Sequence, residues 1–374
     1  MSGKRIEGMK QARSGIQVSR REVIATSGTA GLVGLAGCGG SDGTGTGGDG
    51  GGDGDGGGDG DGGGTQGSVD TDATQEDFTI TFIPHSSGAS DPFWAIEEKG
   101  WSAAVDQLSV EGQFQGPTEF DPQQQVQNIN SAISSGVDGI ATSISDPDLF
   151  DDPLQRAQEE GIPVIAVNIP EFGERTLPYQ GYVGNDETVV GNEVASNALE
   201  DFQEATGEMP ARAVIPNHQP GNTVLGLRSD GIKEVMSNNN ISVDEIATSS
   251  DPSENISSLS SYRSSNSDVD IVCSLGPASG EPAIQWINEN DLQGEVYVAG
   301  VDITEKIQQA IENEVYFGTV IQQPYLQGYL AAHYLAQKLV NGILAPTVTP
   351  TGPTWIDDTR LDLVRTQIQN TGGA

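Results

Sequence analysis

The chain has only two cysteines among its 374 residues, Cys38 and Cys273. So few cysteines exclude the disulfide framework that stabilises many small secreted domains. Cys273 stands alone in the apolar run Ile271-Val272-Cys273, with no neighbouring base, so we expect a buried core residue and not a nucleophile.

Cationic side chains are also scarce, because 17 lysines and arginines stand against 54 aspartates and glutamates, a formal net charge of −37. A surface this acidic opposes binding to nucleic acid and to anionic membranes, since both need Lys and Arg to neutralise phosphates. The composition is typical of proteins from extreme halophiles, where molar salt shortens the Debye length to about 3 Å and screens the self-repulsion. We therefore expect a halophilic source and no nucleic-acid partner.

Motifs for catalysis and for cofactor binding are missing as well. The sequence has no Walker loop, no zinc-ligand spacing and no Gly-x-Ser-x-Gly elbow. No two carboxylates can be identified by spacing as a glycosidase pair. We expect no catalytic residues, no cofactor and no metal, which makes an exported sugar-processing enzyme the least favoured class.

The first 37 residues have the parts of an export signal in the right order. Ser19-Arg20-Arg21-Glu22-Val23 precedes a Gly/Ala-rich apolar segment that ends at Leu35-Ala36-Gly37-Cys38. Adjacent arginines before such a segment predict twin-arginine export, and the ending resembles a lipobox in which Cys38 is diacylated. The segment is too short and too rich in glycine to span about 30 Å of hydrocarbon. We expect lipid anchoring at the outer face of the cell membrane.

Residues 38–76 contain mostly Gly and Asp after the cysteine, with few apolar side chains. Such a segment cannot bury enough apolar surface to offset the entropy of ordering, so it predicts a flexible tether.

From Phe78 onward, strand and helix signals alternate to the end of the chain. Asp91-Pro92 and Asp121-Pro122 each supply an N-cap and a proline in the first helical turn. Strands are expected at 78–83, 139–144, 162–167, 213–216, 271–275, 296–301 and 315–321. Repeated βα units imply parallel sheets with right-handed crossovers, and the length implies two domains. We predict an α/β fold with two doubly wound parallel-sheet lobes.

Ligands of open parallel sheets bind beyond the carboxyl ends of the strands. The residues that follow the predicted strands are therefore the candidates for a binding site. They are His85, Phe93, Trp94, Ser143, Asp146, Asn168, His218, Arg228, Asp302 and Gln322.

On this frame, residues 78–359 resemble the type I periplasmic sugar-binding proteins of ABC importers, the ribose-binding-like group. The motifs that carry the resemblance are, in chain order, Asp91-Pro92-Phe93-Trp94, Ser143-Ile144-Ser145-Asp146-Pro147, Asn217-His218-Gln219-Pro220-Gly221-Asn222, Arg228-Ser229-Asp230-Gly231, Gln322-Gln323-Pro324-Tyr325-Leu326-Gln327-Gly328-Tyr329 and Thr351-Gly352-Pro353.

The resemblance implies two lobes joined by three hinge segments, near Asn185, near Gln322-Gln323 and near Leu344–Pro346. It divides the chain into a first lobe of residues 77–185 and 323–345 and a second lobe of residues 186–322 and 346–370.

The resemblance also implies sugar contacts at positions where the motifs match. Phe93 and Trp94 fall where the family stacks aromatic rings on a sugar face. Arg228 matches an arginine whose planar guanidinium suits vicinal hydroxyls. Asp302 matches a carboxylate that accepts from two hydroxyls, and Gln322 matches a glutamine that both donates and accepts.

Other positions depart from the pattern of the ribose binder. Asn168 stands where that protein has an aspartate, and Ile169 stands where it has an arginine. Leu275-Gly276-Pro277 replaces a segment that contains an asparagine. These departures argue against ribose itself as the ligand. Four further residues are expected to line the site, namely Ser143, Asp146, His85 and His218.

We therefore expect a monomeric, extracytoplasmic solute-binding component of an ABC importer. Its lobes would close on a small neutral sugar or polyol and deliver it to the permease. A sugar-sensing receptor for chemotaxis or signalling has the same fold and remains an alternative, as does a nucleoside-type ligand. A repressor of this fold would need a basic N-terminal helix-turn-helix, which residues 1–75 lack. Sequons at Asn240 and Asn255 permit N-glycosylation.

Overall fold

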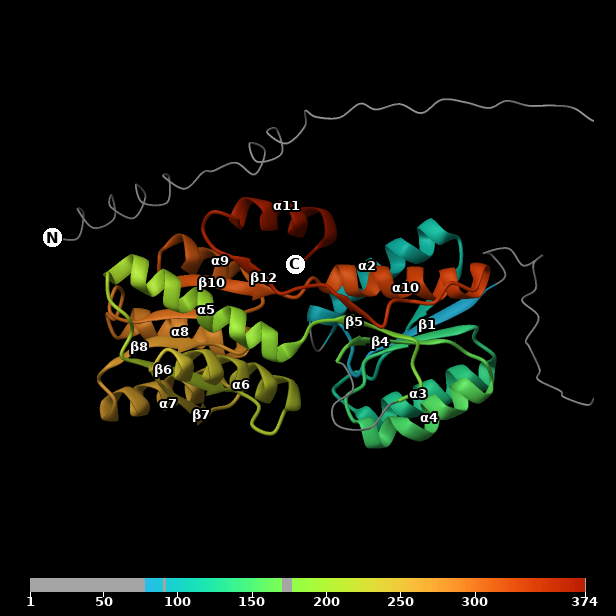
Figure 1. The fold of residues 1–374 in the computed structure, drawn as a ribbon, viewed down its shortest axis with the longest axis horizontal. Helices are drawn as coiled ribbons and strands as arrows, with labels where there is room; N and C mark the ends of the chain where they lie inside the picture. The colour runs from blue at the N-terminus through green and yellow to red at the C-terminus, as the bar shows by residue number, and fades with distance from the viewer. Residues whose placement is uncertain (1–77, 90–91, 170–176, 374) are drawn as a thin grey trace, which may run out of the picture. The chain divides into compact units, whose positions relative to one another are not determined.

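The computed structural model describes residues 78–89, 92–169 and 177–373, which form two α/β lobes (Figure 1). The predicted export signal, the lipobox cysteine Cys38, the tether and the N-cap Asp91 lie outside the described residues. Each lobe contains a six-stranded sheet. All strand pairs within the two sheets are parallel except β10 with β12. The predicted fold class is confirmed, with one antiparallel edge strand added.

The first sheet has the strand order β11-β5-β4-β3-β1-β2. The elements of this lobe are β1 (Thr79–Ile83), α2 (Pro92–Leu108), β2 (Glu111–Phe114), α3 (Pro122–Ser135), β3 (Gly139–Thr142), α4 (Pro147–Glu159), β4 (Val164–Asn168), β5 (Gly181–Gly184), α10 (Pro324–Asn341) and β11 (Val348–Pro350).

The second sheet has the corresponding order β12-β10-β9-β8-β6-β7. The elements of this lobe are α5 (Glu187–Thr206), β6 (Arg212–Asn217), α6 (Thr223–Asn238), β7 (Ser242–Ala247), α7 (Pro252–Ser265), β8 (Val269–Cys273), α8 (Pro277–Glu289), β9 (Tyr297–Val301), α9 (Glu305–Glu312), β10 (Tyr316–Ile321), β12 (Thr354–Ile356) and α11 (Leu361–Thr371).

Helices cover both faces of each sheet, so the central strands are apolar on both sides. In the first lobe, α2 and α10 cover one face and α3 and α4 cover the other (Figure 1). In the second lobe, α5 and α6 cover one face, and α7, α8, α9 and α11 cover the other. Cys273 is fully buried in the second lobe, which confirms the expected core role, and burial raises its pKa to about 12.

The start of α3 follows the predicted chemistry. Asp121 caps α3 through a hydrogen bond from the Gln124 amide, and a proline occupies the first turn. Gly136 ends the same helix in the left-handed conformation, with φ of 77°.

The strand order reverses at the same place in both sheets. In the first sheet, β2 lies on one side of β1 and the next strand, β3, lies on the other side. In the second sheet, β7 and β8 lie on the two sides of β6 in the same way. Loops at the carboxyl ends of the two strands diverge at such a point and leave a crevice. His85 and Ser143 follow β1 and β3 in the first lobe, and His218 and Leu275 follow β6 and β8 in the second.

The chain passes between the two sheets three times, after β5, after β10 and after β11. The first two crossings lie near Asn185 and Gln322-Gln323, where the resemblance put them. The third was expected near Leu344–Pro346, but β11 pairs with β5 in the first sheet, so this crossing follows Pro350. The backbone oxygen of Gln322 accepts hydrogen bonds from Gln327 Nε2 (3.0 Å) and Thr351 Oγ1 (2.9 Å), which links the second and third crossings.

The two sequons differ in exposure. Asn240 is exposed, whereas the Asn255 side chain is 0% exposed and its Nδ2 donates to Thr248 Oγ1 at 3.2 Å. Attachment of a glycan at Asn255 therefore requires this part of α7 to open. Within the described segments, no helix is both long and apolar enough to cross a membrane.

Candidate functional site

A buried polar cluster lies at the carboxyl ends of strands in the second lobe. Arg228, only 6% exposed, donates from Nε to Glu187 Oε2, from one terminal nitrogen to the Leu275 oxygen at 2.9 Å and from the other to Gln322 Oε1 at 3.0 Å. Gln322 in turn donates from Nε2 to Asp302 Oδ1 at 2.8 Å. The structure thus brings together three predicted residues, Arg228, Gln322 and Asp302.

Close packing of α5 on α6 positions the ion pair of this cluster. Gly191 of α5 and Gly231 of α6 face the partner helix so closely that a Cβ on either would overlap a backbone oxygen, of Arg228 and of Thr188 respectively. Glu187 lies one turn before Gly191, and Arg228 lies one turn before Gly231, so the two side chains meet at the same end of the helix pair.

The surroundings of Arg228 keep its guanidinium charged. Burial acts to lower the pKa of Arg228, but the carboxylates of Glu187 and Asp302 outweigh burial and leave this pKa above its ordinary value. His218 lies in the same region. Burial and then the charge of Arg228 lower the pKa of His218 to about 4, so its imidazole is neutral at pH 7. Among the described residues, the buried His218 Nδ1 has no hydrogen-bond partner.

The first lobe has a second polar cluster at the ends of β1 and β3. His85 Nδ1 lies 3.0 Å from Ser143 Oγ, and Ser143 is fully buried. Gln125 of α3 is also fully buried and donates from Nε2 to Thr142 Oγ1 and to the backbone oxygens of Ile83 and Ser143. Gln125 therefore ties α3 to the carboxyl ends of both strands and fixes the backbone beneath His85 and Ser143.

The buried setting of His85 predicts a loss of stability in acid. Burial lowers the pKa of His85 to about 4, against about 6.5 in an unfolded chain. Below pH 6.5 the unfolded chain therefore binds the proton first. The free energy of unfolding should fall as the pH drops from about 6.5 towards 4, by at most about 1.4 kcal/mol per pH unit from this residue.

Urea denaturation of wild type and His85→Gln between pH 7.5 and 5 measures this contribution. A glutamine can still bond Ser143 but does not titrate, so the variant should show a flatter pH profile. If the free energy of unfolding falls equally with pH in both proteins, His85 is not the cause of the loss of stability in acid.

Two aromatic rings, Trp94 and Phe120, contact His85, and a third, Phe93, packs against Trp94; the three differ in exposure. Trp94 is 1% exposed and packs with Phe82 in the core, while Phe93 is only partly buried. Phe120, which was not predicted, is 61% exposed and meets the His85 ring edge-to-face with centroids 5.0 Å apart. Of the two predicted rings, Phe93 is thus the accessible one, and Phe120 is a further ring that a ligand could contact.

Two other predicted residues have local structural roles. Asp146 is exposed and caps α4, its Oδ1 accepting from the amides of Asp148 and Leu149. Asn168 ends β4 in the left-handed region with φ of 62°, and its backbone oxygen accepts from Tyr182 at 2.7 Å. Asp302 has the same conformation, with φ of 64°. This conformation is rare for residues other than glycine. Asn168 and Asp302 stand at the carboxyl ends of β4 and β9, which occupy the same place in the strand orders of the two sheets, so the two residues correspond to each other in the two lobes.

Sequence reasoning missed Glu187 and Gln125. Glu187 follows β5, a four-residue strand that was not predicted, so the residues beyond its carboxyl end were not considered. The Asp186 N-cap before Glu187 was the available signal. Gln125 lies inside a helix, where sequence gives no sign that one glutamine is fully buried.

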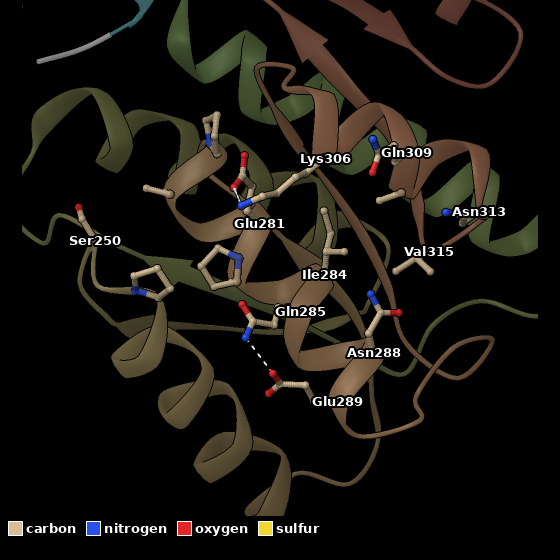
Figure 2. Close-up of a pocket in the computed structure, with 15 residues that line it drawn as sticks. Ser250, Glu281, Ile284, Gln285, Asn288, Glu289, Lys306, Gln309, Asn313 and Val315 are labelled. Atoms are coloured by element: carbon tan, nitrogen blue, oxygen red, sulfur yellow. Dashed lines mark hydrogen bonds and ion pairs between the residues drawn. The ribbon is translucent and has the colours of Figure 1, made fainter. Parts of the chain in front are cut away.

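A separate hollow of about 520 Å³ lies between α7, α8 and α9 in the second lobe (Figure 2). Glu281 binds Lys306 Nζ at 2.7 Å on one side of it, and Gln285 donates to Glu289 on the other. None of the ten predicted site residues lines this hollow. Within the described part of the chain, His, Cys, Asp and Glu side chains do not gather in groups of three or more that could hold a metal ion.

Comparison with known proteins gives consistent matches. A family model described as a periplasmic binding protein domain matches residues 80–342. The xylose/arabinose-binding protein XylF of Sulfolobus acidocaldarius is 28% identical over 295 residues, which cover 75% of this chain and 71% of that protein.

Solved structures match over a similar range. A periplasmic sugar-binding protein of an ABC sugar transporter from Legionella pneumophila has a TM-score of 0.65 at 28% identity, covering 74% of this chain and 99% of that one. A carbohydrate transporter protein from Acidothermus cellulolyticus in complex with myo-inositol has a TM-score of 0.66 at 25% identity, covering 79% and 99%.

Proposed function

Since the chain belongs to the periplasmic binding protein domain family, we propose that it is the receptor that binds a small neutral sugar or polyol for an ABC importer. Members of this family are extracytoplasmic solute-binding proteins of ABC transporters and not enzymes. Beyond this family assignment, we propose the class of ligand, a small neutral sugar or polyol, and its delivery to a permease.

The observation that carries the proposal is the cluster of Arg228, Gln322 and Asp302. Its three side chains differ in hydrogen-bonding capacity. The guanidinium of Arg228 only donates, the amide of Gln322 donates and accepts, and the carboxylate of Asp302 only accepts. A sugar hydroxyl also donates and accepts, so adjacent hydroxyls can bond neighbouring groups of this set. A planar guanidinium is suited to two hydroxyls at once.

Aromatic rings of the first lobe complement this polar set. Phe93 and Phe120 offer partly buried and exposed faces, on which the C–H groups of a sugar ring can pack. Under the proposal, the sugar contacts these rings and the Arg228 cluster together only when the lobes close about their three crossings. Ligand binding would then shift the protein towards the closed state.

The membrane attachment and the solvent form part of the same proposal. Diacylation of Cys38 after twin-arginine export would anchor the monomeric receptor at the outer face of the membrane, beside its permease. The net charge of −37 is consistent with a halophilic setting. A signalling receptor would use the same ligand site with a different membrane partner, and a neighbouring permease and ATPase gene pair would favour transport.

A thermal-shift screen in molar KCl tests the ligand class. The panel contains D-xylose, L-arabinose, D-galactose, myo-inositol, nucleosides and amino acids. A ligand at about 100 times its Kd should stabilise the protein by roughly 2.7 kcal/mol, which raises the Tm measurably. A shift with a sugar or polyol supports the proposal. A shift only with a nucleoside or an amino acid would keep the fold and overturn the ligand class.

A further inference from the structure

The ion pair between Glu187 and Arg228 belongs to the proposed sugar site, and both side chains are buried, at 1% and 7% exposure. We propose that Glu187 is a specificity-determining positioning residue that makes the site reject anionic sugars, such as uronic acids and sugar phosphates, in favour of neutral ones. This inference rests on the proposed function and concerns the same site.

Glu187 acts first on geometry. The guanidinium of Arg228 has five N–H groups, and within the described residues Glu187, Leu275 and Gln322 accept from three of them. The remaining two lie on the two terminal nitrogens, because Glu187 takes the Nε–H. These three bonds fix the orientation of the guanidinium, and under the proposal its two remaining N–H groups donate to a pair of adjacent hydroxyls.

Glu187 acts second on charge. The cluster contains one cation, Arg228, and two carboxylates, Glu187 and Asp302, and both carboxylates interact electrostatically with the guanidinium. The other side chain with basic character here, His218, is neutral at pH 7 because its pKa is lowered to about 4. The cluster thus has an excess of negative charge although an arginine lies at its centre, and a ligand carboxylate or phosphate is disfavoured.

An arginine without this partner would have the opposite effect. Guanidinium groups recognise carboxylate and phosphate by paired hydrogen bonds. Replacing Glu187 by glutamine retains an acceptor of the same length for Arg228 Nε but removes one negative charge. The charge of the cluster then approaches neutrality, so an anion that bonds the two remaining N–H groups of Arg228 no longer meets an excess of negative charge.

The experiment measures the affinities of two matched probe pairs by calorimetric titration of the full chain. L-arabinose is paired with D-galacturonate and D-xylose with D-glucuronate, because each acid has the ring of its partner with an added carboxylate. Glu187→Gln should raise the affinity for the acid relative to the neutral sugar at least tenfold, which corresponds to about 1.4 kcal/mol. Glu187→Asp retains the charge and should retain the rejection of acids.

The matched control is Glu200→Gln, the same chemical change at an exposed position of α5, about 20 Å farther along the helix. It should leave the ratio unchanged. Equal changes in Glu187→Gln and Glu187→Asp would indicate a merely structural role and overturn the inference.

Titrations of the wild-type protein distinguish failure of the proposed function from failure of the inference about Glu187. If it binds none of the neutral sugars of the screen, the proposed function fails. If it binds a neutral sugar and the matched acid with similar affinity, the function stands and the inference fails. Circular dichroism shows whether Glu187→Gln folds. If it does not fold, Glu187→Asp provides the test. A tenfold rise in the affinity for the acid relative to the neutral sugar in this variant, which retains the charge, would contradict the inference.

Discussion

Replacement of Arg228 by alanine is expected to lower the free energy of unfolding by about 3–5 kcal/mol, because the substitution leaves the buried carboxylate of Glu187 without its partner. It also removes donors from the Leu275 oxygen and from Gln322. Urea denaturation at constant KCl concentration measures this loss, with equal slopes for wild type and variant as the check of two-state behaviour.

Two further variants test the cause of this loss. Arg365→Ala removes an arginine that pairs with Glu312 and Asp362 at the surface, and its stability should remain near that of wild type. The double variant Arg228→Met, Glu187→Gln removes both buried charges and should recover much of the lost stability. Similar losses for Arg228→Ala and Arg365→Ala would contradict the importance given to the buried pair.

The largest effect on ligand binding is expected for Asp302. Its carboxylate is partly exposed, is held by Gln322 Nε2 and would accept from two sugar hydroxyls. A hydrogen bond to a charged group contributes about 1.5–3 kcal/mol. Asp302→Asn should therefore weaken binding of the sugar identified by the screen by at least about tenfold, as measured by calorimetric titration.

Asp146→Asn is the matched control, because it makes the same chemical change at the other predicted aspartate. Asp146 caps α4, and asparagine is an equally good N-cap, so both stability and affinity should stay close to wild type. A loss of affinity in Asp146→Asn as large as that in Asp302→Asn would assign Asp146 to the ligand site and contradict its purely capping role.

The sequence predicted most of the strands that are buried on both faces, but not β5, whose four residues are buried and include two glycines. The apolar runs at 139–144, 271–275 and 296–301 correspond to β3, β8 and β9, all central in their sheets. The edge strands β2 and β7 were missed, because most of their side chains are exposed and polar and show no apolar run. Edge position removes the signal on which such predictions depend.

The site residues could be predicted from the sequence where the strand before them was predicted. Asp302 and Gln322 directly follow strong central strands, and the structure joins them through one hydrogen bond. Glu187 was missed because it follows the unpredicted β5. Trp94 and Phe93 are adjacent in sequence, yet helix geometry turns one ring into the core and leaves the other partly exposed. Sequence alone does not distinguish these two orientations.

A crystal structure of the protein with the sugar that gives the largest thermal shift is the most direct test of the central claim. We expect one sugar whose hydroxyls bond Arg228 and Asp302, with the Phe93 ring against its apolar face. A sugar bound instead in the hollow between α7, α8 and α9, with the Arg228 cluster unoccupied, would contradict the account.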